Sequence, residues 1–225
     1  MYPGHQARAN GNKIAFMMAE SGVSVTYSEL DARSNRLAHL FRALGLQNLD
    51  HYSIFMENNA RYVECCAAGE RAGLYYTCVN SFLKPQELAY ILNNSQSKLL
   101  ITSTAKIDIA RVALAECPGI TQCLIVDGEG DGAQIRSLDD AAKKYPVSPI
   151  ADEALGNAML YSSGTTGQPK GVLRPMPASL PSEPLKLYTF LSDLWGHRED
   201  MILLMPAPLY HAAPHLDITR LPIWR

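Results

Sequence analysis

Residues 161–172 read YSSGTTGQPKGV, a stretch that combines glycines, hydroxyl side chains and one lysine. Gly164 and Gly167 can adopt positive φ and leave the backbone bare, so that successive N–H groups can turn toward an anion. The hydroxyl groups add hydrogen-bond donors, and Lys170 adds a mobile positive charge suited to phosphate. An apolar run at 158–161 leads into the stretch and is typical of a buried strand. The sequence therefore predicts a phosphate-binding loop directly after a strand.

The Walker phosphate loop is a different pattern, and it does not fit this stretch. That pattern requires G-x-x-x-x-G-K-[ST], with the lysine at the start of a helix. Here the second glycine follows Gly164 too early, and Gly171 stands after Lys170 where a hydroxyl residue would hold magnesium. A flexible linker is the plain alternative, but a linker seldom carries Pro-Lys-Gly directly after a Ser/Thr/Gly run between apolar strands.

Apolar strands alternate with amphipathic helices along the chain. Thr26 and Glu29 form a capping box, in which a hydroxyl and a carboxylate each satisfy a free N–H at a helix start. Gly45 can end that helix, and Pro85 suits the first turn of a later one. The predicted helices cover 26–44, 60–72, 85–92, 107–116, 137–144 and 185–195, and the predicted strands cover 23–25, 53–56, 75–79, 99–102, 123–126, 158–161 and 201–205. This alternation is typical of an α/β fold around a largely parallel sheet flanked by helices.

Composition and charge exclude several classes of protein. The net charge of −2 is spread along the chain, so nothing favours binding to nucleic acid or to an anionic membrane. No apolar run approaches the roughly twenty residues of a membrane span, and residues 1–12 carry no apolar signal core. The five cysteines are odd in number and lack C-x-x-C spacing, which indicates free thiols in a reducing compartment. We therefore expect a cytoplasmic protein without a membrane span.

The 161–172 stretch resembles, almost letter for letter, the phosphate loop of the adenylate-forming (AMP-binding) enzymes. These include acyl-CoA synthetases, aryl-CoA ligases, firefly-type luciferases and the adenylation domains of peptide synthetases. Other similar segments are ENN at 57–59, GERAGLYYTCVN at 69–80, PQEL at 85–88 and PLYH at 208–211. The resemblance is strongest to fatty acyl-CoA synthetases, and it implies the N-terminal part of their large domain.

The resemblance also implies a reaction and its participants. In this family the loop holds the β- and γ-phosphates of ATP while a substrate carboxylate attacks the α-phosphorus, and the acyl group then passes to coenzyme A. ATP, Mg²⁺, coenzyme A and a fatty or related carboxylic acid are therefore the implied ligands. His211, in Pro-Leu-Tyr-His, would help to position the carboxylate and the adenylate phosphate, unless it is an ordinary histidine of the core. The residues that would cradle the pyrophosphate are Ser162, Ser163, Gly164, Thr165, Thr166, Gly167 and Lys170.

No metal ligand is expected from the sequence itself. His211 and His215 are four residues apart, but Pro214 should prevent the helix that would align them, and no glutamate lies between them. The run at 127–132 resembles half of a calcium loop without its bidentate glutamate, so a surface turn is expected there. The adjacent Cys65 and Cys66 read as buried, inert thiols.

Several segments that the family uses have no counterpart after Pro214. These are the segments that grip adenine, bind the ribose, place magnesium through a glutamate and supply the lysine of a small C-terminal domain. We therefore expect residues 1–225 to be an incomplete N-terminal AMP-binding domain, with impaired or no activity and a tendency to associate with itself or with a complementary chain. Alternatives left open are a catalytically dead nucleotide-binding module, one half of a split enzyme, and an unrelated nucleotide-binding α/β domain.

Overall fold

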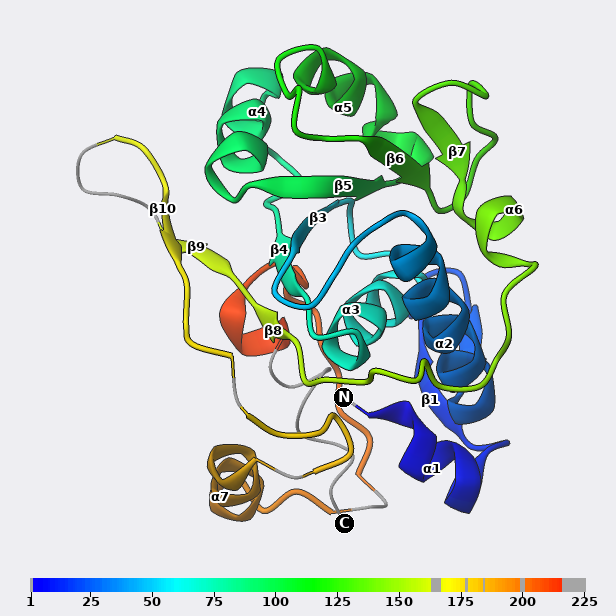
Figure 1. The fold of residues 1–225 in the computed structure, drawn as a ribbon. Coiled ribbons are helices and arrows are strands. Elements are labelled where there is room, and N and C mark those ends of the chain that lie inside the picture. Colours follow the sequence, from blue (N-terminus) through cyan, green and yellow to red (C-terminus); the bar gives the residue numbers. More distant parts are fainter. Residues whose placement is uncertain (1, 163–166, 177, 184, 199–200, 216–225) are drawn as a thin grey trace.

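The computed structural model describes residues 2–162, 167–176, 178–183, 185–198 and 201–215 (Figure 1). A six-stranded sheet lies at its centre, in the order β7-β6-β5-β3-β4-β8, and every neighbouring pair of strands in it is parallel. This confirms the predicted fold class. The strands are β3 (His51–Phe55), β4 (Tyr75–Cys78), β5 (Ser97–Thr102), β6 (Gln122–Ile125), β7 (Ile135–Ser137) and β8 (Asn157–Ala158).

Helices cover both faces of this sheet. The connection from β3 to β4 runs in one direction along the sheet and carries α3 (Tyr62–Arg71), whereas the connections from β4 to β5 and from β5 to β6 run in the other direction. Because such crossovers are right-handed, opposite directions place helices on opposite faces. Accordingly α4 (Pro85–Asn94) and α5 (Ile107–Leu114) lie across the sheet from α3 (Figure 1).

The remaining helices and strands lie at the margins of the sheet. On the α3 side are α2 (Tyr27–Ala43) and α6 (Leu138–Ala142), and α1 (Pro3–Asn10) packs against α2. Two antiparallel pairs complete the strands: β1 (Ile14–Met17) with β2 (Ser24–Thr26), and β9 (Leu160–Ser162) with β10 (Lys170–Val172). A 3₁₀ turn (Thr104–Lys106) precedes α5, and α7 (Lys186–Leu194) lies at the lower end of Figure 1. None of the described helices combines the length and the apolar character needed to cross a bilayer.

Each face of the sheet has its own apolar core. Tyr52 and Ile54 of β3 pack in one core with α2 and α3, and Phe55 of the same strand packs in the other with α4 and α5. This alternation follows from the two-residue period of a strand. Strands that are buried on both faces have nearly continuous apolar sequences, and these strands could therefore be predicted from the sequence.

The predicted start of α2 is confirmed in detail. The Glu29 N–H donates to Thr26 Oγ1 (3.3 Å), and the Thr26 N–H donates to Glu29 Oε2 (2.8 Å), so both halves of the capping box are present. Gly45 follows the helix with φ of 89°, a conformation that suits glycine because it has no Cβ.

Three expectations about secondary structure are corrected. The run at 201–205 is not a strand, because no described strand lies beside it, and Ile202 is 97% exposed. The single strand expected at 158–161 is two strands, since β8 pairs with β4 whereas β9 turns away to pair with β10. Residues 212–215 are helical although they contain Pro214. Proline is tolerated there because the N–H groups of a first helical turn have no partner within the helix.

Candidate functional site

Strands β9 and β10, which flank the predicted phosphate loop in the sequence, form a hairpin that projects from the side of the molecule (Figure 1). Lys170 is the register partner of Ser162, and the Ser162 hydroxyl donates to the Lys170 carbonyl oxygen at 3.4 Å. Gly167 adopts a φ of 92° and is exposed. Ser163, Gly164, Thr165 and Thr166 lie outside the described residues. The hairpin therefore fixes the two ends of the loop close to each other.

Two tyrosines fasten this hairpin to α4. Tyr90 of α4 donates its hydroxyl proton to the Pro169 carbonyl oxygen (3.1 Å), and Tyr161 of β9 donates to Asn94 Oδ1 (2.6 Å). Burial raises the pKa of Tyr161 to about 12, so its hydroxyl keeps the proton that it donates at neutral pH. The loop is thus mounted on a helix of the main domain.

Lys170 carries a positive charge that is available to a ligand. Its side chain is exposed, and no carboxylate in the described part of the chain forms an ion pair with it. The next residue, Gly171, is exposed, and a Cβ there would meet the Met159 methyl group, which is the end of a flexible side chain, and the Tyr161 ring at 3.1 Å. A small residue therefore fits best directly after the lysine.

The Pro-Leu-Tyr-His segment is held at the carboxyl edge of the sheet by Asn58, which follows β3. The Leu209 N–H donates to Asn58 Oδ1 (2.9 Å), and Asn58 Nδ2 donates to the Ala207 carbonyl oxygen (3.2 Å). His211 is exposed, and its ring centroid lies 4.4 Å from that of Tyr210. Ligands of open parallel α/β sheets bind at this edge. The structure thus gives a positioning role to Asn58, which the sequence marked only through its resemblance.

The predicted site residues form two groups rather than one cluster. Among the described residues, no hydrogen bond or ring contact joins His211 to the loop. His215 points elsewhere, since its ring is buried and hydrogen-bonded to Tyr76, so the two histidines do not share a ligand. A cavity of about 130 Å³ lies between α2, α3 and α6, away from both groups. It is lined by Arg33, Arg36, Leu37, Arg61, Glu64, Leu138, Asp139, Ala142 and Lys143.

All five cysteines are free and buried. Burial raises the pKa of Cys65 and of Cys66 well above the usual value, and it raises that of Cys123 to about 12. These protonated thiols fit the expectation of inert cysteines. Cys78 differs: burial by itself raises its pKa, but its contact with the Cys66 thiol and the charge and ring nitrogen of His215 outweigh burial and lower it.

The described residues do not form a magnesium site at the loop. Mg²⁺ prefers oxygen ligands in octahedral geometry. Among the described residues, the group of histidine, cysteine and acidic side chains close enough to share an ion consists of Cys66, Cys78 and His215, whose soft ligands do not suit Mg²⁺. We therefore assign no step to Mg²⁺.

The curated proteins of related sequence have names that refer to the transport of a carboxylic acid or its ligation to CoA. Long-chain fatty acid transport protein 1 of Mus musculus is 28% identical over 220 residues, which are 93% of this chain and 33% of that protein. Long-chain-fatty-acid–CoA ligase FadD13 of Mycobacterium tuberculosis is 30% identical over 205 residues, which are 88% of this chain and 38% of that protein. 4-Coumarate–CoA ligase 1 of Petroselinum crispum is 27% identical over 201 residues, which are 89% of this chain and 37% of that protein. The chain thus spans little more than a third of the length of these relatives.

Solved structures share the fold. The fatty acyl CoA synthetase of Mycobacterium tuberculosis superposes with a TM-score of 0.74 at 21% identity, covering 98% of this chain and 42% of that one. The anthranilate CoA ligase AuaEII, in complex with anthranoyl-AMP, superposes with a TM-score of 0.74 at 21% identity, covering 93% of this chain and 40% of that one. The family profile described as AMP-binding enzyme matches residues 4–221, nearly the whole chain, and the chain therefore belongs to the AMP-binding enzyme family.

Proposed function

We propose that this chain supplies the phosphate-binding part of an enzyme that activates a carboxylic acid with ATP and transfers the acyl group to coenzyme A. The observation that carries the proposal is the β9–β10 hairpin. It presents Lys170, exposed and without an ion pair in the described part of the chain, opposite Ser162 at the ends of a glycine- and hydroxyl-rich loop. A cation beside such a loop is suited to a polyphosphate.

The loop acts on the leaving group in the proposed first step. A carboxylate oxygen of the acid attacks the α-phosphorus of ATP, the bond from that phosphorus to the bridging oxygen breaks, and pyrophosphate leaves. Ser162, Ser163, Gly164, Thr165, Thr166, Gly167 and Lys170 hold the β- and γ-phosphates and stabilise the charge that develops there. The product is an acyl-adenylate, from which the thiol of coenzyme A then displaces AMP.

His211 is proposed to position the reacting groups. Its backbone follows the turn that Asn58 holds at the carboxyl edge of the sheet, and its ring is exposed rather than packed in the core. An exposed imidazole there can donate to a carboxylate or phosphate oxygen. A fatty acid is the proposed substrate, supported by the names of the mouse and mycobacterial relatives, whereas the parsley relative is named for an aromatic acid.

Exchange of labelled pyrophosphate into ATP tests the first step. Lys170→Ala is expected to lower acid-dependent exchange by roughly 10- to 150-fold, because a charge-assisted hydrogen bond contributes about 1.5–3 kcal/mol. Fatty and aromatic acids are compared as substrates, and Lys186→Ala removes an exposed lysine from α7 as the matched control. In the same assay, His211→Ala is expected to raise the KM for the acid.

Equal losses from Lys170→Ala and Lys186→Ala would contradict the assignment of the loop. If the folded chain catalyses no exchange but binds ATP in a manner that depends on Lys170, it acts as a nucleotide-binding module or as half of a split enzyme. If it neither exchanges nor binds ATP, the proposed function is wrong for this chain.

We also propose that the chain works in the cytoplasm and associates with itself or with a complementary chain. Its five free cysteines support a reducing compartment.

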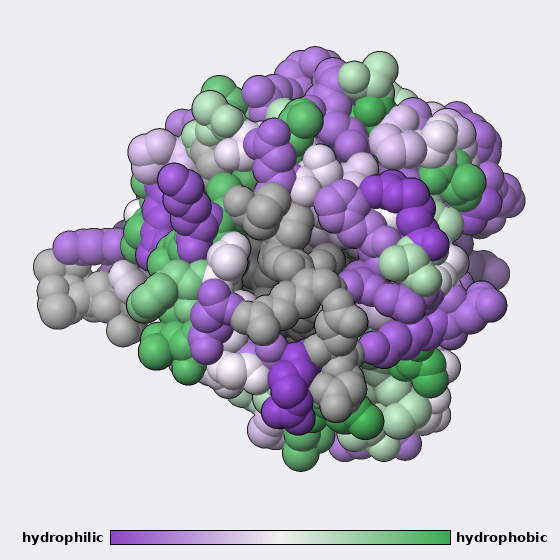
Figure 2. Space-filling view, turned by 90° about the horizontal axis from the view of Figure 1, so that it is seen from below, coloured by the Kyte–Doolittle hydropathy of each residue, from purple (hydrophilic) through white to green (hydrophobic). Residues whose placement is uncertain are grey.

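Exposed apolar side chains support association, and Figure 2 shows hydrophobic patches among hydrophilic ones on the face seen from below. A monodisperse monomer in sedimentation velocity would count against self-association. Exposed apolar residues in α7 and in the segments that follow it are Leu187, Phe190, Leu194, Trp195, Met201, Ile202, Leu203 and Leu204.

A further inference from the structure

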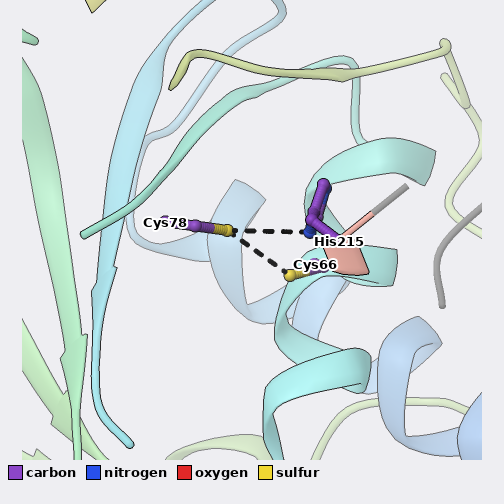
Figure 3. Close-up of side chains that lie close together, drawn as sticks. All are labelled: Cys66, Cys78 and His215. Carbon is purple, nitrogen blue, oxygen red and sulfur yellow. Dashed lines mark hydrogen bonds between the residues drawn. The ribbon is translucent and has the colours of Figure 1, made fainter. Parts of the chain in front are cut away.

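Two cysteines and one histidine converge in the core beneath the sheet (Figure 3). Cys66 comes from α3, Cys78 from the end of β4, and His215 from the helical turn at 212–215. Cys66 Sγ lies 4.0 Å from Cys78 Sγ, and Cys78 Sγ lies 3.9 Å from His215 Nδ1. All three potential ligand atoms lie within 4.8 Å of one another.

These separations are close to those of a tetrahedral zinc site. With Zn–S of about 2.3 Å and Zn–N of about 2.0–2.1 Å, two sulfur ligands lie about 3.8 Å apart, and a sulfur and a nitrogen ligand lie about 3.6 Å apart. The two printed separations exceed these values by about 0.2 and 0.3 Å. The third pair, Cys66 Sγ and the His215 ring nitrogen, lies within 4.8 Å, so metal binding would draw these two side chains closer by up to about 1.2 Å.

Hydrogen bonds orient His215 for this role. Tyr76 donates its hydroxyl proton to Glu70 Oε1 (2.8 Å), so the lone pairs of its oxygen can accept from His215 Nε2–H (2.9 Å). This arrangement places the ring proton on Nε2 and directs the lone pair of Nδ1 toward Cys78. A metal-bound histidine typically donates its other ring N–H to such a partner, which fixes its tautomer and orientation.

The surroundings favour a bound cation over three neutral side chains. Cys66, Cys78 and His215 are 0%, 5% and 6% exposed; the two cysteines belong to the apolar core, and the buried carboxylate of Glu70 lies behind Tyr76 on the other side of His215. On metal binding the Cys66 and Cys78 thiols would release their protons to solvent, and the two thiolates would then neutralise a divalent cation within this core. Tyr62 of α3 also carries a buried hydroxyl that has no hydrogen-bond partner within the described part of the chain.

We propose that Cys66, Cys78 and His215 bind a structural Zn²⁺ ion. Zinc suits this set because it takes thiolate and imidazole ligands in tetrahedral geometry. Binding would fasten the 212–215 turn, and with it the adjoining Pro-Leu-Tyr-His segment, to α3 and β4. The site does not depend on the proposed enzymatic function, because none of its ligands belongs to the phosphate loop.

Metal analysis of the full chain tests this proposal. Chain purified with zinc and then dialysed is expected to retain about one zinc ion per chain, and replacement by Co²⁺ should produce thiolate-to-cobalt charge-transfer absorption. Cys66→Ser, Cys78→Ser and His215→Gln should each lose most of the bound metal. Cys65→Ser is the matched control, because Cys65 is equally buried next to Cys66 but is not one of the three ligands, and it should retain the metal.

The cobalt spectrum of the unaltered chain decides the matter even if a ligand variant fails to fold. A chain that holds neither zinc nor cobalt, or a spectrum without thiolate-to-cobalt bands, would overturn the proposal. So would equal loss of metal from Cys65→Ser and Cys66→Ser, or a disulfide between Cys66 and Cys78 in the purified chain.

Discussion

Arg71→Met is expected to lower the free energy of unfolding by about 3–5 kcal/mol, because it removes one partner from a buried ion pair. Arg71 is 1% exposed. Its guanidinium donates to Asp31 Oδ1 (2.8 Å), to the Asp31 carbonyl oxygen (3.1 Å) and to Ser34 Oγ (3.0 Å), and it lies 3.4 Å from Glu153 Oε1. Methionine would fill much of the volume but leave the carboxylates without their cation. Urea denaturation of both proteins measures the difference.

Two further variants separate the loss of charge from other effects. Arg111→Met removes an arginine whose side chain is 48% exposed and paired with Asp131, and it should change stability by less than about 1 kcal/mol. Adding Asp31→Asn to Arg71→Met should recover part of the loss, because it removes an unpaired carboxylate. If Arg71→Met is as stable as Arg111→Met, the buried network does not stabilise the fold as described.

Strong local patterns made the centre of the fold predictable. The capping box at Thr26 and Glu29 marks the start of α2 through contacts that lie within four residues of each other. Strands β3 to β6 are buried on both faces and therefore read as apolar runs wherever they stand in the sheet. Alternation of such runs with helices then indicates a parallel sheet.

Elements that depend on a distant partner could not be predicted in this way. β10 (Lys170–Val172) is exposed at every position and exists as a strand through its pairing with β9. The run at 201–205 has the opposite character: it is apolar, but no described strand lies beside it, and an apolar run forms a strand only with a neighbour.

The same reasoning applies to the sites. The phosphate loop is contiguous in sequence, so its composition alone pointed to its ligand. Cys66 and Cys78 are 12 residues apart, and His215 follows Cys78 by 137, so no spacing motif relates them. In addition, His215 reaches the core on the helical turn at 212–215, whereas the sequence predicted that Pro214 would prevent a helix there. Such a cluster becomes visible only when α3, β4 and the 212–215 turn are packed together.

Gly156→Ala is expected to lower the free energy of unfolding by at least about 3 kcal/mol, since overpacking against a fixed backbone falls at the upper end of such costs. A Cβ at Gly156 would collide with the Gly69 carbonyl oxygen and would lie 2.6 Å from the Leu74 carbonyl oxygen. The backbone cannot simply retreat, because the Gly156 N–H donates to the Glu70 carbonyl oxygen at 2.7 Å. Gly156 directly precedes β8, which leads into β9, so a shift there would also displace the phosphate hairpin.

Gly119→Ala provides the matched control for this substitution. Gly119 is exposed, and the nearest atom to a Cβ there, the Ser97 carbonyl oxygen, would be 3.9 Å away, which is ordinary van der Waals contact. Its stability should therefore stay within about 0.5 kcal/mol of the unaltered chain. Thermal unfolding of the two variants compares them directly. If Gly156→Ala unfolds at the same temperature as Gly119→Ala, the close approach of Gly156 to the end of α3 does not hold β8 in place, and the pairing of β8 with β4 carries that role instead.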